Sequence, residues 1–359
     1  TLRNRCLADA FRKVAPDTDI VWCATAETFA LVPPLRQDFA CVVLPDAPQR
    51  EQVQALAQHI SASGAERPIL VTDGYHLDHA TMDAAREHGL AGVSLFIDEK
   101  ANRLLGDQTF VVDYLPSRPS DWQGLIGADT DLLSGPAYQM VSTRFEKVAS
   151  LREGVLAHRV AGYRRNVILM NGGFNIGGML ESMIDHAMQD ADAWKDVTFK
   201  IFVMSTAPGF KALRQKIEDA REANLKIVFL PDNNHIPEHI GNADLYIGAA
   251  GMTPFELGAA GGIPCVLMPA GHNQQKIAAL VHARRAGFNA GDFLTLEDGE
   301  LRRTKDADAT IARAMTLGRD ILDSKRTYGA LSRCSRAFCD GQGARRVAEK
   351  ALQAQLHIS

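Results

Sequence analysis

"GAAGMTPFELGAAGGIPCVLMPAGHNQQ", residues 248–275, is the stretch of the chain that decides the fold. It contains six glycines, a single acid, the apolar run IPCVLMP and a polar end. An apolar run between glycine-rich turns is typical of a strand that is buried on both faces of a parallel sheet. The stretch therefore predicts two strand ends, one before Gly251 and one before Gly271, at the edge of a sheet where ligands bind.

The rest of the chain repeats this alternation of short apolar runs and longer amphipathic segments. The apolar runs of the first half are DIVWCA, FACVVLP, PILVTD, GVSLFID and TFVVDY. Those of the second half are NVILMNGG, TFKIFVMS, LKIVFLPD, ADLYIGAAG and IPCVLMPAG. Helical patterns such as QREQVQALAQHISASG lie between the runs. The alternation predicts an α/β fold with two doubly wound domains, each built on a mostly parallel sheet.

Chain length and one break in the alternation predict the domain boundaries. A chain of 359 residues exceeds what one hydrophobic core usually organises. We expect an N-terminal domain over residues 1–150, a second domain over 163–335, and a C-terminal helix over 336–359 that can return to the first domain. The break predicts a hinge near residues 145–163. Because a helical pattern starts almost at Thr1, we expect the first strand of the first domain to precede it.

Composition excludes several classes of function. The formal net charge is −4 at pH 7, so no dominant positive field attracts nucleic acid or an anionic membrane. No apolar run approaches the ~20 residues that span a bilayer, and no secretory signal pattern is present, which predicts a cytoplasmic protein. The six cysteines are scattered and none forms a C-x-x-C pair. We expect no disulfide framework, no metal and no cofactor.

The segment ILMNGGFNIGG, residues 168–178, carries the first candidate site. Gly172 and Gly173 follow an expected strand, and Asn175 leads toward an expected helix. Glycines allow the backbone to approach a ligand, and the N–H groups at the start of a helix bind anions. The segment matches neither a Walker loop nor G-x-G-x-x-G, so a plain tight turn explains it as well as a phosphate site.

The second candidate site lies in the opening stretch itself. Gly251 and Met252 lead into a helix that Thr253 can cap, and Glu256 lies in its first turn. An acid in the first turn complements the helix dipole without any further function. At the ligand-binding edge of a sheet, the same carboxylate can accept hydrogen bonds from both hydroxyls of a ribose.

Two further strand ends carry polar residues. His272, Asn273 and Gln274 begin a helix after the run IPCVLMP, and their side chains suit a pyrophosphate or a sugar. Ile236, in the loop FLPDNNHIPEHIGNAD, can lie against a flat base. An ordinary loop explains each of these positions alone. Together, four such strand ends in successive β-α units favour a nucleotide site, in which the glycines of residues 248–275 admit the phosphates and Glu256 binds the ribose.

These residues resemble two related groups of proteins. The order GG, GAAG-T--E and HNQQ resembles the nucleotide-binding domain of GT-B glycosyltransferases, in which two Rossmann-like domains face each other across a cleft. The segments LVTDGYHLD, FIDEKANR, LLSGPAYQMVSTRFE and DGQGARRVAE resemble the UDP-sugar hydrolases of pseudaminic acid biosynthesis. This resemblance implies a UDP-linked diacetamido-trideoxyhexose as the substrate, UDP as a product, and a place in the glycosylation of surface structures or flagellin.

The resemblance also implies roles for particular residues. Asp73 and Tyr75 enter the cleft from the first domain and, with His272, are the candidate catalytic residues. Asn273 and Gln274, again with His272, face the phosphates or the sugar. The expected nucleotide-binding residues are Gly172, Gly173, Asn175, Ile236, Gly251, Met252, Thr253 and Glu256.

One departure from the hydrolase pattern leaves three functions open. The family carries G-H-x-x-R-C-L, and its histidine activates water; here Arg5 is the arginine and Leu2 occupies the place of the histidine. Leucine cannot accept a proton. Either another base has taken its place, with His76, His79 and His272 as candidates, or the chain transfers the sugar to a glycan or flagellin acceptor. The third alternative is a nucleotide-sugar-binding protein without catalysis.

Overall fold

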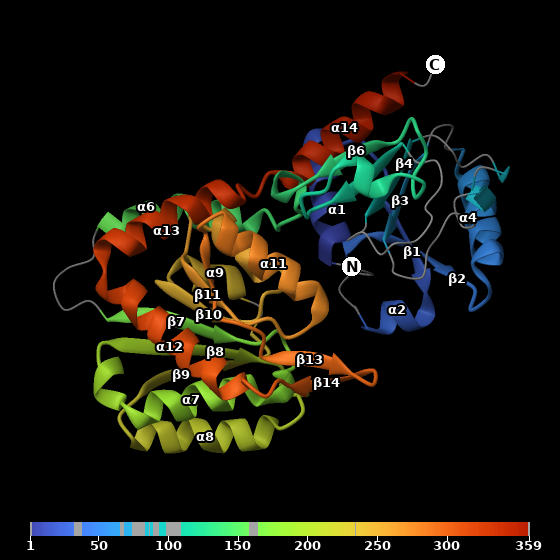
Figure 1. The fold of residues 1–359 in the computed structure, drawn as a ribbon. Helices are drawn as coiled ribbons and strands as arrows, with labels where there is room; N and C mark the ends of the chain where they lie inside the picture. Colours follow the sequence, from blue (N-terminus) through green and yellow to red (C-terminus); the bar gives the residue numbers. More distant parts are fainter. Residues whose placement is uncertain are drawn as a thin grey trace. The chain divides into compact units, whose positions relative to one another are not determined.

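A computed structural model of the chain describes residues 2–31, 38–64, 68–73, 83–85, 87–88, 93–97, 109–157, 164–233 and 235–357. The chain divides into two compact units (Figure 1). Unit 1 contains residues 1–140 and 342–359, and unit 2 contains residues 141–341. The C-terminal helix therefore belongs to unit 1, and the segment expected to be a hinge belongs to unit 2. None of the described helices is long and apolar enough to cross a membrane.

Unit 1 is built on parallel strands. Two of them, β1 and β2, pair with each other, and four others form a sheet in the order β3-β4-β5-β6. The strands are β1 (Val21–Thr25), β2 (Ala40–Leu44), β3 (Ile69–Asp73), β4 (Val93–Ile97), β5 (Phe110–Asp113) and β6 (Asp131–Ser134). The helices are α1 (Leu2–Val14), α2 (Ala26–Leu31), α4 (Gln49–Ser63) and α14 (Gly343–His357), with the 3-10 turns η1 (Pro119–Trp122) and η2 (Pro136–Tyr138).

The first and last described helices share the core of unit 1. Leu7 and Phe11 of α1 pack in one apolar cluster with Val347 and Ala351 of α14, and all four side chains are buried. Phe110 of β5 belongs to the same cluster. This packing explains why the C-terminal helix joins unit 1, although the whole of unit 2 separates it from α1 in the sequence.

Unit 2 contains a six-stranded parallel sheet in the order β12-β11-β10-β7-β8-β9. Its strands are β7 (Arg165–Met170), β8 (Val197–Val203), β9 (Lys226–Pro231), β10 (Leu245–Gly248), β11 (Cys265–Leu267) and β12 (Gly287–Asn289). An antiparallel hairpin follows, formed by β13 (Leu294–Glu297) and β14 (Glu300–Arg303). Taken in chain order, the six strands have the 3-2-1-4-5-6 arrangement of dinucleotide-binding α/β domains.

Helices cover both faces of this sheet. They are α6 (Arg144–Ala157), α7 (Met179–Gln189), α8 (Phe210–Glu222), α9 (Ile236–Gly241), α10 (Thr253–Ala259), α11 (His272–Ala283), α12 (Ala307–Asp323) and α13 (Lys325–Phe338), with the 3-10 turns η3 (Ile176–Gly178) and η4 (Ala191–Trp194). Figure 1 shows α7 and α8 on one side of the sheet and α9 and α11 on the other. The central strands have unbroken apolar runs because both of their faces are buried; Val167, Ile168 and Leu169 of β7 are almost completely inaccessible.

Residues 132–166, where the alternation breaks in the sequence, differ from the prediction. We expected no alternation of strand and helix there, but the end of β6 and the whole of α6 lie in this segment. The prediction was wrong because β6 contains only two consecutive apolar residues, Leu132 and Leu133, too few for a strand signal. In α6, Arg152 occupies a fully buried position where an amphipathic pattern would carry an apolar residue.

Candidate functional site

The strand order places a change of direction between β7 and β10. From β7 the chain moves outward to β8 and β9, and it then returns to the other side of β7 to form β10, β11 and β12. Met170 and Gly248, the last residues of β7 and β10, are paired in register, so the turns that follow them begin side by side. In open α/β sheets, ligands bind at this point, beyond the carboxyl ends of the strands.

The turn after β7 is held by its own side chains. Gly172 has a φ of +56°, which favours glycine, and it is exposed. Asn175 is buried; its Oδ1 accepts a hydrogen bond from the N–H of Leu180 at 3.0 Å, and its Nδ2 donates to Glu181 at 2.6 Å. Asn175 therefore orders the start of α7 from inside the turn. Its expected contact with a nucleotide stays a prediction.

The turn after β10 combines close packing with open backbone. A Cβ on Gly248 would overlap the carbonyl oxygen of Met170 on the neighbouring strand, so only glycine fits there. A Cβ on Gly251, in contrast, would meet no atom within 4 Å. The backbone at Gly251 is accordingly the part of this turn that another molecule can approach.

Glu256 lies in the first turn of α10, directly after this open backbone. Burial of the carboxyl group raises the pKa of Glu256 to about 7, because the surrounding protein disfavours the charged form. A hydrogen bond with the side chain of Thr253 opposes part of this rise. The residue as a whole is only partly buried, so one side of it reaches the surface. A carboxyl group of this kind can be ionised by a ligand that offers it hydrogen-bond donors.

The sequence analysis did not identify Tyr246, a residue of β10 whose hydroxyl contacts the backbone at the turns after β7 and β10. Its hydroxyl is buried and lies 2.8 Å from the carbonyl oxygen of Ala249 and 3.1 Å from that of Met170, and its proton can bond to either. Burial also raises the pKa of Tyr246 far above its usual value, so the residue stays a neutral donor. A tyrosine within an apolar strand gives no sign of this role in the sequence.

Other glycines of residues 248–275 serve packing. A Cβ on Gly258 would lie 2.6 Å from the carbonyl oxygen of Ser335 and 2.8 Å from that of Cys339. A Cβ on Gly262 would likewise overlap the carbonyl oxygen of Ser332. We interpreted the glycines of the stretch as room for the phosphates of a nucleotide; for Gly258 and Gly262 that interpretation is wrong, because they allow α10 and the turn after it to approach α13 closely.

Gln274 ties together the turns after β10 and β11. Its Oε1 accepts the N–H groups of Ala250 and Ala270, each at 3.0 Å. The side-chain oxygen of Gln274 is therefore engaged with backbone, whereas the neighbouring His272 and Asn273 are exposed. The expected contacts of all three with phosphate or sugar stay predictions.

Gln275 makes a second set of contacts at the start of α11. Its Oε1 lies 3.2 Å from Nδ1 of His272, and its Nε2 donates to Oδ2 of Asp292 at 2.8 Å. Asp292 lies in the loop after β12. The histidine at the ligand edge is thus linked through an amide to a carboxylate on a separate element. Ile236 begins α9 and is partly buried.

In unit 1, Asp73 is the last residue of β3, and its Oδ1 accepts a hydrogen bond from Arg3 at 2.8 Å. Tyr75, His76 and His79 lie outside the described residues. Among the residues that the structure describes, no group of three His, Cys, Asp or Glu side chains is arranged to hold a metal ion.

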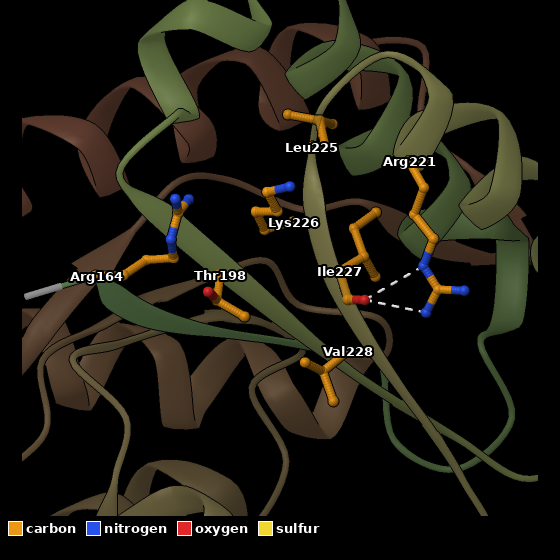
Figure 2. A pocket seen from close by; sticks show the side chains of 7 residues that line it. All are labelled: Arg164, Thr198, Arg221, Leu225, Lys226, Ile227 and Val228. Atoms are coloured by element: carbon orange, nitrogen blue, oxygen red, sulfur yellow. Dashed lines mark hydrogen bonds between the residues drawn. The ribbon is translucent and has the colours of Figure 1, made fainter.

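A cavity of about 450 Å³ lies at the opposite end of the strands of unit 2 (Figure 2). It is lined by Arg164, Thr198, Arg221, Leu225, Lys226, Ile227 and Val228. Arg221 is engaged there in hydrogen bonds to the carbonyl oxygen of Ile227. Apart from Arg221, which lies near the end of α8, these residues lie at or just before the beginnings of β7, β8 and β9, so the cavity is separate from the candidate site at the ends of these strands.

No protein-family model matches the sequence, and no curated protein matches it. Solved structures of similar fold extend over nearly the whole chain. MurG from Acinetobacter baumannii has a TM-score of 0.60 and 15% identity, over 98% of this chain and 95% of that one. A UDP-GlcNAc 2-epimerase from Neisseria meningitidis bound to UDP-GlcNAc has a TM-score of 0.59 and 11% identity, over 98% and 97%. A glycosyltransferase from Rickettsia africae has a TM-score of 0.60 and 15% identity, over 99% and 95%. This likeness shows a GT-B-like α/β fold.

Proposed function

We propose that this chain is an enzyme that acts on a nucleotide-linked sugar, and that unit 2 binds the nucleotide beyond the ends of β7 and β10. The observation that carries the proposal is the partly buried residue Glu256 with its raised pKa, which lies in the first turn of α10 directly after the open backbone at Gly251. The two hydroxyls of a ribose are neutral hydrogen-bond donors, and one carboxylate can accept a hydrogen bond from each of them. A UDP-sugar is the substrate that we favour, because three of the similar folds belong to proteins named as UDP-GlcNAc 2-epimerases, one of them bound to UDP-GlcNAc.

The reaction that we propose is attack at the anomeric carbon of the sugar. Water, or the hydroxyl of an acceptor, forms a bond to this carbon while its bond to the diphosphate oxygen breaks and UDP leaves. Negative charge then develops on the diphosphate. The N–H groups at the starts of α7 and α11 lie at the same edge of the sheet and supply donors for it.

Hydrolysis of a UDP-linked diacetamido-trideoxyhexose is the specific activity that the sequence resemblance favours. Transfer to a glycan or flagellin acceptor is the second candidate, because Leu2 occupies the place of the histidine that activates water in that family. His272 is the candidate base in the described part of unit 2. His76 and His79, beyond the described residues, are the candidate bases from unit 1, and Asp73 and Tyr75 are its other candidate catalytic residues.

Calorimetric titration with UDP tests the nucleotide site. Replacement of Glu256 by alanine should weaken UDP binding about tenfold or more, because hydrogen bonds to a charged group are lost. Glu297, an exposed acid on β13, provides the matched control, and E297A should bind UDP like the natural chain. Equal affinity of E256A and the natural chain would refute the site.

The reaction is tested by incubating the protein with UDP-GlcNAc and with the UDP-linked diacetamido-trideoxyhexose, each with and without flagellin or glycan acceptors. Release of UDP from the free sugar nucleotide supports hydrolysis, and release only with an acceptor supports transfer. Formation of the 2-epimer, or binding of UDP without any turnover, would contradict both.

A further inference from the structure

The side chain of Gln275 connects a histidine and an aspartate that come from different elements. His272 and Gln275 lie three residues apart in the first turn of α11, and Asp292 follows β12. The two hydrogen bonds are 3.2 Å from the His272 Nδ1 to the Gln275 Oε1 and 2.8 Å from the Gln275 Nε2 to the Asp292 Oδ2. Each of the three groups has a different capacity to donate or accept hydrogen bonds. The connection therefore determines which atom carries the proton in each bond.

Asp292 fixes the direction of this chain of hydrogen bonds. An ionised carboxylate only accepts hydrogen bonds, whereas a primary amide donates through nitrogen and accepts through oxygen. The amide nitrogen of Gln275 must therefore face Asp292, and its oxygen must face His272. The imidazole nitrogen next to that oxygen can then bond to it only as a donor. In a neutral imidazole, one nitrogen carries the proton and the other carries the lone pair.

We propose that Gln275 and Asp292 are positioning residues that hold neutral His272 with its proton on Nδ1, so that Nε2 keeps the lone pair and can accept a proton. The tautomer itself follows from the contacts in unit 2. The use of Nε2 as the base that takes the proton of the attacking water or hydroxyl rests on the proposed function. On this proposal, the proton moves from the attacking oxygen to Nε2 as that oxygen bonds to the anomeric carbon.

The neighbouring glutamine shows why the role is specific to Gln275. The oxygen of Gln274 is engaged by the N–H groups of Ala250 and Ala270, whereas the oxygen of Gln275 faces the His272 Nδ1. The two glutamines thus divide two tasks: Gln274 joins the loops after β10 and β11, and Gln275 orients His272 against the loop after β12.

Nitrogen NMR of the ring tests the tautomer directly, without any substrate. The protein is labelled with ¹⁵N in its histidine rings, and the signals of His272 are identified by their loss in H272N. At a pH where the ring is neutral, we expect the proton on Nδ1 in the natural chain. We expect Q275A and D292A each to shift the population toward a proton on Nε2. A proton on Nε2 in the natural chain, or an unchanged tautomer in both folded variants, would overturn the proposal.

Gln215 supplies a matched control. Its amide donates to Asp219 at 2.9 Å on the exposed face of α8, which is the same kind of contact without a histidine. Q215A should leave the tautomer of His272 unchanged; if Q215A moves it as much as Q275A does, the shift is nonspecific and the proposal fails. Circular dichroism identifies the variants that fold.

The catalytic part is tested by the kinetics of UDP release. Q275A and D292A should lower kcat about tenfold with little change in KM, because a base in the wrong tautomer cannot accept the proton. An unchanged kcat in variants whose tautomer has shifted would refute the catalytic part. A chain that neither releases UDP nor transfers the sugar, but keeps the tautomer, would refute the proposed function and leave the positioning intact.

Discussion

Replacement of Glu256 by glutamine should stabilise the ligand-free protein at neutral and alkaline pH and weaken its binding of UDP. The free carboxyl group has a usual pKa of 4.5, and burial raises the pKa of Glu256 to about 7 in the folded chain. Between these two values the folded state binds a proton that the unfolded state has lost. The contribution of this group therefore reduces stability as the pH rises from about 4.5 to about 7, and the loss is complete above that range.

The magnitude follows from the same two pKa values. A tenfold change in proton affinity corresponds to about 1.4 kcal/mol, so the full rise corresponds to about 3 kcal/mol. Because one side of Glu256 reaches the surface, solvent screening reduces this figure, and we expect about 2 kcal/mol. Glutamine has nearly the same shape, carries no charge, and can still bond to Thr253. The gain in E256Q should accordingly be small near pH 5, roughly a quarter of its full size, and essentially complete at pH 8.

Urea unfolding of the natural chain and E256Q at pH 5 and pH 8 measures this gain. For a unit of this size, about 2 kcal/mol corresponds to a rise of several degrees in Tm, so thermal unfolding gives a second reading. Saturating UDP should raise the Tm of the natural chain more than that of E256Q. A stability difference that does not vary with pH, or an E256Q protein that is less stable at pH 8, would refute the reasoning.

Four further predictions concern the same unit. UDP binding at pH 6 should release a proton, because ribose hydroxyls favour the ionised form of Glu256, whose pKa in the free protein is about 7. Calorimetry in buffers of different ionisation enthalpy measures this release, and equal heats in all buffers would contradict it. G258A should lower the free energy of unfolding by about 1–3 kcal/mol, because its new Cβ would overlap the backbone at α13. G251A should leave the free energy of unfolding nearly unchanged and weaken UDP binding. Similar unfolding curves for the two variants would show that packing does not distinguish the two positions. Q274A should lower the free energy of unfolding by about 1–3 kcal/mol because two backbone N–H groups lose their acceptor, and urea unfolding checks this. R152A should lower the free energy of unfolding by about 3 kcal/mol, because two buried carbonyl oxygens and a tyrosine hydroxyl lose their hydrogen bonds to the guanidinium. A urea midpoint like that of the natural chain would exclude this.

The fold was largely predictable because strands buried on both faces leave unbroken apolar runs. Each of the ten runs identified in the sequence coincides with a strand. The elements that were missed, β6, β12 and the hairpin of β13 and β14, are short or exposed, so neither length nor periodicity marks them. The strand order is a property of the whole sheet and leaves no local signal.

The candidate site was predictable only in part, because the sequence shows which residue follows a strand but not what surrounds it. The place of Glu256 could be inferred from a carboxylate in the first turn of a helix after a strand. Its raised pKa could not, because it depends on burial among residues that the fold brings together. Gly251 and Gly258 look alike in the sequence, yet one is open and the other touches α13, which is formed far along the chain.

The two glutamines of α11 show where the order of the site comes from. Successive residues of an α-helix point about 100° apart, so neighbours can serve different parts of the surrounding structure. Gln274 reaches the backbone after β10 and β11, while Gln275 reaches toward the loop after β12. Together with Tyr246, which bonds to the backbone around β7 and β10, these side chains tie four strand ends of one sheet to one another. A ligand at this edge therefore meets loops that are already ordered, and changes in residues that never touch the ligand should alter its binding.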